Sequence, residues 1–229
     1  MKVTYIHHSC FLIETEKCYY LFDYFKGNLP VLDTAKPILV FSSHAHPDHY
    51  SNTIFSLLKE RGMQYIYAIL SDDISKDCYP ANIPVTTVTP HQKYDLIHDT
   101  GLETLFSTDE GVAFLLTCPY GTIYHGGDLN DWVWEGESEE YNLQMTETYQ
   151  REIKNIKGRE IDLAFLVLDP RQEKDYAKGI SFFLEQTRTK KVFPMHYWEK
   201  PKTIQRFITE YPRYQSLIEN TEEYKSRTL

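Results

Sequence analysis

The pattern of apolar and polar positions in the first quarter of the chain is typical of short β-strands. Runs rich in β-branched and aromatic residues cover residues 3–6, 11–14 and 19–23, and they are closely spaced, as in a meander. Residues 38–41 form a continuous apolar run, which predicts a strand that is buried on both of its faces. These segments form the first of two β-rich regions.

A helix and a second β-rich region follow. Residues 51–62 place Ile54, Leu57 and Leu58 on one helical stripe, and Gly62 is a suitable helix stop. The further predicted strands cover residues 65–70, 85–89, 102–106, 112–117, 122–125, 163–168 and 191–195. The further predicted helices cover residues 139–157, 180–187 and 203–210.

The order of these elements predicts an α+β fold. Two β-rich regions, each followed by helices, favour two packed mixed sheets with helices on both outer faces. No short-period repeat and no low-complexity linker divides the chain. We therefore expect a single domain over residues 1–229.

Composition and charge narrow the class of partner. With 41% hydrophobic and 25% charged residues, the chain has the composition of a soluble globular protein. Its net charge of −9 disfavours broad affinity for nucleic acids or anionic membranes, which requires a basic surface. An anionic small molecule stays open as a substrate, because bound metal can supply local positive charge. No pattern in the chain specifies an oligomeric state.

The cysteines and the N-terminus predict a cytoplasmic protein. The four cysteines are scattered, without a Cys-x-x-Cys pair, so they indicate neither a disulfide framework nor a thiolate zinc site. The first residues lack the long apolar region of a signal peptide. No segment approaches the roughly 20 apolar residues that a membrane helix needs.

The strongest chemical signal is the sequence His-Ala-His-Pro-Asp-His, which directly follows the apolar run at 38–41. Imidazole nitrogens and carboxylate oxygens are the ligands that zinc and related divalent metals prefer. Crowding them at the end of a strand directs them toward one point. The candidate ligands in this motif are His44, His46, Asp48 and His49.

Polar residues also follow three later predicted strands. Asp128 comes after strand 122–125, Asp169 after strand 163–168, and His196 after strand 191–195. Side chains at strand ends can converge on one cleft, where binding and catalytic residues are often placed. The glycines directly before Asp128 allow the backbone to approach a ligand closely.

Together these residues resemble the metallo-β-lactamase-fold hydrolases, over residues 3 to about 210. The family hallmark His-x-His-x-Asp-His is matched by His44, His46, Asp48 and His49. The resemblance implies that Asp128 bridges two metals and that His196 completes the second site. It also implies an αββα sandwich, in agreement with the element order. Residues 5–14 are similar to the lactonase-like and phosphodiesterase-like branch.

The chain departs from the family pattern at one ligand. The family usually has another first-metal histidine just before the strand at 112–117, where this chain has Ser-Thr-Asp-Glu. Asp109 or Glu110 could substitute, His91 could reach in, or water could fill the position. We therefore expect the second site to bind metal more dependably than the first.

Several other residues near these motifs could have either a functional or a purely structural role. His8 is either a substrate-facing or supporting residue or a turn histidine, and Asp169 either orients a metal-bound histidine or is a turn residue. Arg171 could bind an anionic group, but a solvated surface position is favoured. Trp132 and Trp134 either wall the cleft or pack in the core. His125 is expected to pack at a strand end, and no role is assigned to His7, His91 or His98.

The resulting prediction is an enzyme, a metal-dependent hydrolase. One or two divalent ions, zinc first and manganese or iron as alternatives, would activate water for attack on a small ester, lactone or phosphorylated molecule. The resemblance implies catalytic roles for Asp128, which would hold both ions, and for Asp48, which would help to orient the nucleophile. His46 argues against the iron-dependent redox members of the fold. The alternative is a degenerate metal-binding or ligand-sensing module.

Overall fold

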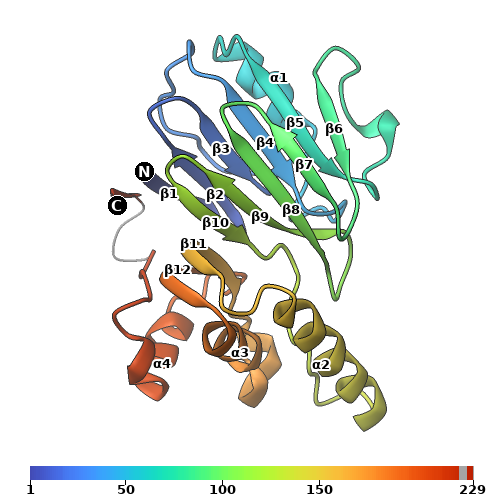
Figure 1. Cartoon of the computed structure of the whole chain (residues 1–229), viewed down its shortest axis with the longest axis vertical. Helices are drawn as coiled ribbons and strands as arrows, with labels where there is room; N and C mark the ends of the chain where they lie inside the picture. Colours follow the sequence, from blue (N-terminus) through green and yellow to red (C-terminus); the bar gives the residue numbers. More distant parts are fainter. Residues whose placement is uncertain (222–225, 229) are drawn as a thin grey trace.

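The computed structural model describes residues 1–221 and 226–228 and consists of two β-sheets that pack face to face, with helices outside them (Figure 1). The first sheet has the strand order β13-β1-β2-β3-β4-β5-β6. Its strands are β1 Lys2–His7, β2 Cys10–Glu14, β3 Tyr19–Phe22, β4 Ile38–Ser42, β5 Ile66–Ser71, β6 Val85–Val88 and β13 Ser226–Thr228. The sheet is mixed, because β3 to β6 run parallel whereas β1 and β2 pair antiparallel with their neighbours.

The second sheet has the order β12-β11-β10-β9-β8-β7 and is also mixed. Its strands are β7 Lys93–Leu96, β8 Thr100–Phe106, β9 Val112–Cys118, β10 Gly121–His125, β11 Glu160–Val167 and β12 Arg188–Met195. The strands β10, β11 and β12 are mutually parallel, so their carboxyl ends lie at the same edge. The longer helices are α1 Thr53–Glu60, α2 Glu139–Lys154, α3 Lys178–Gln186 and α4 Lys202–Glu210.

Three apolar cores separate four layers. Strand β4 separates two of these cores. All five of its residues are buried, and its four apolar residues alternate between the two cores. Leu39 and Phe41 face the core between the sheets, whereas Ile38 and Val40 face the core under α1. The third core lies between the second sheet and the helices α2, α3 and α4 (Figure 1). The predicted α+β sandwich with helices on both outer faces is confirmed.

Two edge strands, β7 and β13, were not predicted. Strand β7 is the sequence Lys-Tyr-Asp-Leu, in which exposed and half-buried residues alternate, and it pairs with only one neighbour. Strand β13 has three exposed residues and pairs only with β1. Edge strands this short and polar lack the apolar run that identifies a central strand. Among the described residues, no helix is long and apolar enough to cross a membrane.

Candidate metal centre

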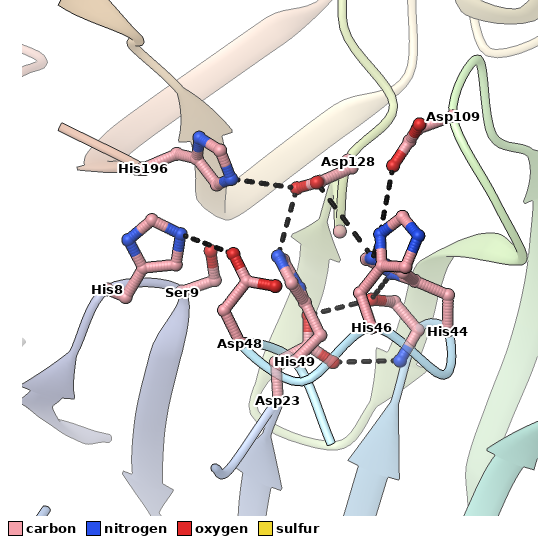
Figure 2. A network of polar contacts seen from close by, with 12 residues as sticks. His8, Ser9, Asp23, His44, His46, Asp48, His49, Asp109, Asp128 and His196 are labelled. Atoms are coloured by element: carbon pink, nitrogen blue, oxygen red, sulfur yellow. Dashed lines mark hydrogen bonds and ion pairs between the residues drawn. The ribbon is translucent and has the colours of Figure 1, made fainter. Parts of the chain in front are cut away.

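The loops after β4, β10 and β12 bring polar side chains together at one edge of the sandwich (Figure 2), and the loop after β11 adds Asp169, which contacts His196. The structure brings together all six residues that the sequence predicts as metal ligands. These are His44, His46, Asp48, His49, Asp128 and His196. Two further residues, His8 and Asp109, join them.

The ligand atoms form two groups, one on each side of Asp128. Its Oδ1 lies 3.2 Å from Nε2 of His49 and 3.5 Å from Nε2 of His196. Its Oδ2 lies on the other side, 3.9 Å from Nε2 of His44. Because each oxygen of this single carboxylate faces a different group, Asp128 has the geometry of a bridge between two cation positions.

The first group consists of His44, His46, Asp109 and Asp128. Asp109 comes from the stretch before β9 in which a further histidine was expected, and its Oδ2 lies 3.3 Å from Nδ1 of His46. Glu110 approaches the outer edge of the same ring at 3.5 Å. His91 takes no part, because its Nε2 lies 2.8 Å from the buried carboxylate of Glu152.

The second group consists of His8, Asp48, His49 and His196, with Asp128 at its border. Four of the candidate ligand atoms here are buried and have no hydrogen-bond partner among the described residues: Nε2 of His8, His49 and His196, and Oδ1 of Asp128. Unpaired buried polar atoms are expensive, and these four converge. A divalent cation would satisfy all of them, and imidazole and carboxylate donors suit zinc and similar metals. The residues present therefore fit a metal.

Buried carboxylates hold the histidine rings from behind. Nδ1 of His49 donates to Asp23 at 2.8 Å, and Nδ1 of His196 donates to Asp169 at 2.9 Å. His44 is joined to the same network through Ser43, whose hydroxyl donates to Asp23. Because these contacts occupy Nδ1, the Nε2 atoms of His49 and His196 face the centre, as in metal sites whose ligands are fixed by outer carboxylates.

Asp23 was missed by the sequence analysis, which placed it only as the last residue of a strand. It is completely buried and accepts hydrogen bonds from the backbone N–H of Ser43 at 2.8 Å, from the Ser43 hydroxyl at 2.7 Å, and from His49. The available signal was the one used for Asp128, a carboxylate directly after an apolar strand. Asp169 has the orienting position that was one of its two predicted readings.

In the second group, His49, His196 and the carboxylates beside them stabilise each other's charged forms, whereas burial lowers the pKa of His8. Burial opposes protonation of His196, but Asp128 and Asp169 outweigh it and raise its pKa to about 9. Burial likewise opposes protonation of His49, yet Asp128 and Asp23 raise its pKa well above the usual value. Without a cation, protons therefore balance the buried carboxylates, and a metal would have to displace them.

His44 behaves in the opposite way. Burial and the nearby His49 together lower its pKa to about 4, in spite of Asp128. Its ring is therefore neutral at neutral pH, which is the form that ligates a metal. The first group thus has at least one ligand that is free of competing protons.

Close backbone approach and unusual backbone conformations shape the centre. Four residues around it have positive φ without being glycine, namely His8, Asp23, His196 and Trp198. Such conformations are unfavourable and tend to occur at functional sites. A Cβ on Gly127, whose φ is +51°, would come within 2.6 Å of Ser43. The sequence predicted that this glycine lets the backbone approach a ligand, but in the structure it allows the Asp128 loop to pack closely against Ser43, directly before His44.

Two hollows flank the centre. One is lined by Trp132, Trp134, Tyr141, Met145 and Arg171 beside Asp109 and Asp128. The other is lined by Tyr5, His7, His8, Phe25, Lys26 and Trp198 beside Asp48. Arg171 lines the first hollow and Trp198 lines the second. These two side chains are in contact, since the guanidinium lies over the Trp198 ring at 4.5 Å and both donate hydrogen bonds to Asp169. Trp132 and Trp134 line the first hollow and also pack in or against the core between the sheets, so both predicted roles apply, and their ring centroids lie 5.6 Å apart.

His125 lies outside both groups. Its ring stacks on Phe22 with a centroid distance of 4.9 Å, and its Nε2 donates to the carbonyl of Ser9 at 2.9 Å. It is a packed strand-end residue in the structure. His98 lies in the turn between β7 and β8, where it has positive φ.

The chain is similar to proteins that are named as metal-dependent hydrolases. A curated metal-dependent hydrolase of Alkaliphilus metalliredigens is 24% identical over 217 residues, which cover 86% of this chain and 85% of the relative. The solved structure of Igni18, a metallo hydrolase of Ignicoccus hospitalis, is 18% identical with a TM-score of 0.64 and covers 100% of this chain and 97% of Igni18.

The same fold also carries other chemistry. The diiron β-hydroxylase CmlA of Streptomyces venezuelae has a TM-score of 0.62 and 10% identity, covering 100% of this chain and 53% of CmlA. At such identities the likeness shows the fold alone. The family model described as "Beta-lactamase superfamily domain" matches residues 2–142. The chain therefore belongs to the beta-lactamase superfamily, and the expected resemblance to its metal-dependent hydrolases is confirmed.

Proposed function

We propose that the protein is a metal-dependent hydrolase with two divalent cation sites that share Asp128. The first site consists of His44, His46, Asp109 and Asp128. The second includes Asp48, His49, Asp128 and His196. The observation that carries the proposal is that two groups of metal-ligand atoms lie on the two sides of the Asp128 carboxylate, and that buried atoms of the second group have no hydrogen-bond partner among the described residues.

When bound, divalent cations there would supply Lewis acidity and a water of lowered pKa for attack on a carbonyl or phosphoryl centre. The protein's own residues provide position and charge. Asp128 spans the two groups, and Asp48 presents a carboxylate that is 31% exposed toward the cleft. Asp23 and Asp169 lock the rings of His49 and His196, so the donor atoms need no reordering.

We propose zinc as the metal and expect the second site to bind it more firmly. The rings of His49 and His196 are 0% and 2% exposed, whereas His46 and Asp109 are 41% and 40% exposed. Partly exposed side chains lose more conformational freedom when they are ordered by a ligand.

We propose a small ester, lactone or phosphorylated molecule as the substrate. The hollow beside Asp128 offers flat aromatic walls from Trp132 and Trp134 for an apolar part. Arg171 borders the same hollow, and the bidentate contact with Asp169 leaves its Nη1 to bind a carboxylate or phosphate oxygen.

Metal content and turnover test the proposal together. Zinc-loaded protein is expected to hydrolyse bis-p-nitrophenyl phosphate, p-nitrophenyl acetate or a simple lactone, and to lose the activity in a chelator. His46→Ala should lower kcat/KM at least about a hundredfold, the scale of losing one stabilising group in a cleft. His91→Ala, whose ring contacts Glu152 instead, is the matched control. Full activity of His46→Ala would contradict the mechanism, and metal binding without turnover of any substrate would support the sensing-module alternative.

A further inference from the structure

His8 lies in the turn between β1 and β2 and directs its ring into the second group. Its φ of 52° is in the left-handed region, and the pairing of β1 with β2 shifts register between Tyr5 and His7, directly before it. The side chain is 3% exposed. Left-handed backbone at a histidine is unfavourable, and His196, in the same group, has it too.

Aromatic contacts hold the His8 ring in this position. Its centroid lies 4.2 Å from that of His196 and 4.6 Å from that of Trp198. The His8 backbone N–H donates to the Tyr5 hydroxyl at 3.0 Å, which fixes the turn from the other side. The ring therefore has little freedom to swing out toward the neighbouring hollow.

The Nε2 atom of His8 is buried and has no hydrogen-bond partner in the part of the chain that the structure describes. It lies 3.4 Å from Oδ2 of Asp48 (Figure 2). One donor atom from each of His8, Asp48, His49 and His196 lies within 4.8 Å of the other three. An unpaired buried donor or acceptor is costly, and one cation would offset that cost for all the atoms that converge here. Nδ1 of the neighbouring His7 is also buried and unpaired among the described residues, but it lies outside the group.

We infer that His8 is a further protein ligand of the second metal site, contributed by the N-terminal β1–β2 turn and absent from the His-x-His-x-Asp-His motif. This inference rests on the proposed function. With His8, the second group offers imidazoles from His8, His49 and His196 together with the carboxylates of Asp48 and Asp128. The larger donor set accounts for tighter metal binding there than at the first group.

Zinc K-edge absorption of the fully loaded protein counts the ligating imidazoles directly. Because the signal is an average over both zinc ions, ligation by His8 predicts five imidazoles per chain, a mean of 2.5 per zinc, and without it the count is four, a mean of 2.0 per zinc. The five are His8, His44, His46, His49 and His196. His8→Ala should remove one imidazole and weaken the tighter zinc site about tenfold or more, the scale of losing support at a metal site. His7→Ala is the matched control, since His7 lines the adjacent hollow but lies outside the group.

The outcomes separate the two claims. A wild-type count of four, or an unchanged count in His8→Ala even with weaker binding, overturns ligation by His8 while the two-site hydrolase stands. Failure of the wild type to bind zinc overturns the proposed function itself. The wild-type count decides the matter even if His8→Ala fails to fold.

Discussion

The buried carboxylate of Asp23 supports two of the candidate ligands at once, so its removal is an informative perturbation. It accepts three hydrogen bonds of 2.7–2.8 Å, two from Ser43 and one from Nδ1 of His49. In Asp23→Asn one amide oxygen can still accept, but the NH₂ group faces a donor. In Asp23→Ala all three donors lose their acceptor inside the core.

The expected magnitudes follow from these contacts. A hydrogen bond to a charged group contributes about 1.5–3 kcal/mol, so Asp23→Asn should lower the free energy of unfolding by about 2 kcal/mol. Asp23→Ala strands a buried polar network and should lower it by about 3–5 kcal/mol. Because the His49 ring loses its orienting partner, zinc affinity at the second site should fall about 10–100-fold.

Urea unfolding in the presence of a chelator, followed by tryptophan fluorescence, measures the stability term without a contribution from metal. Zinc titration against a chromophoric chelator measures the affinity. The control is Asp33→Asn, at an exposed turn position, which should change stability by no more than about 0.5 kcal/mol. If Asp23→Ala stays within about 1 kcal/mol of the wild type and binds zinc normally, the supporting role of Asp23 is refuted.

Three further changes probe the centre and its surroundings. Asp109→Ala should weaken the looser zinc site at least about tenfold and spare the tighter one, as read by the same titration; equal weakening of both would contradict separate sites. Gly111→Ala should cost about 3 kcal/mol in urea unfolding, because its φ is +67° and a Cβ would overlap the Ser43 carbonyl; a neutral result would show that the loop adjusts freely. Tyr124→Phe should raise the free energy of unfolding by about 1 kcal/mol, because the buried hydroxyl has no partner among the described residues; a loss of stability would reveal a hidden hydrogen bond.

Much of the architecture could be predicted because central strands and helices have distinct apolar patterns. The strand Ile38–Ser42 is buried on both faces, as the unbroken apolar run at residues 38–41 predicts. The edge strand Lys93–Leu96 has no such pattern and was missed. Polar residues directly after buried strands were the productive signal for the centre, since the carboxyl ends of parallel strands share one edge.

Contacts between segments far apart in the sequence could not be predicted. Asp23 supports His49 because β3 and β4 pair in parallel, with Phe22 opposite Phe41, and a single sequence does not reveal that register. The position of Asp109 was open among several alternatives for the same reason. His8 reaches the second group through a β-turn with positive φ, a conformation that residue type alone does not indicate.

Anomalous scattering from a crystal of the zinc-loaded protein tests the central claim most directly. Two peaks on opposite sides of Asp128 are predicted, one bounded by His44, His46 and Asp109 and the other by Asp48, His49 and His196. The second peak should have the higher occupancy when zinc is limiting. No peak between these side chains, or a single peak that persists at saturating zinc, would contradict a two-metal centre built on this carboxylate.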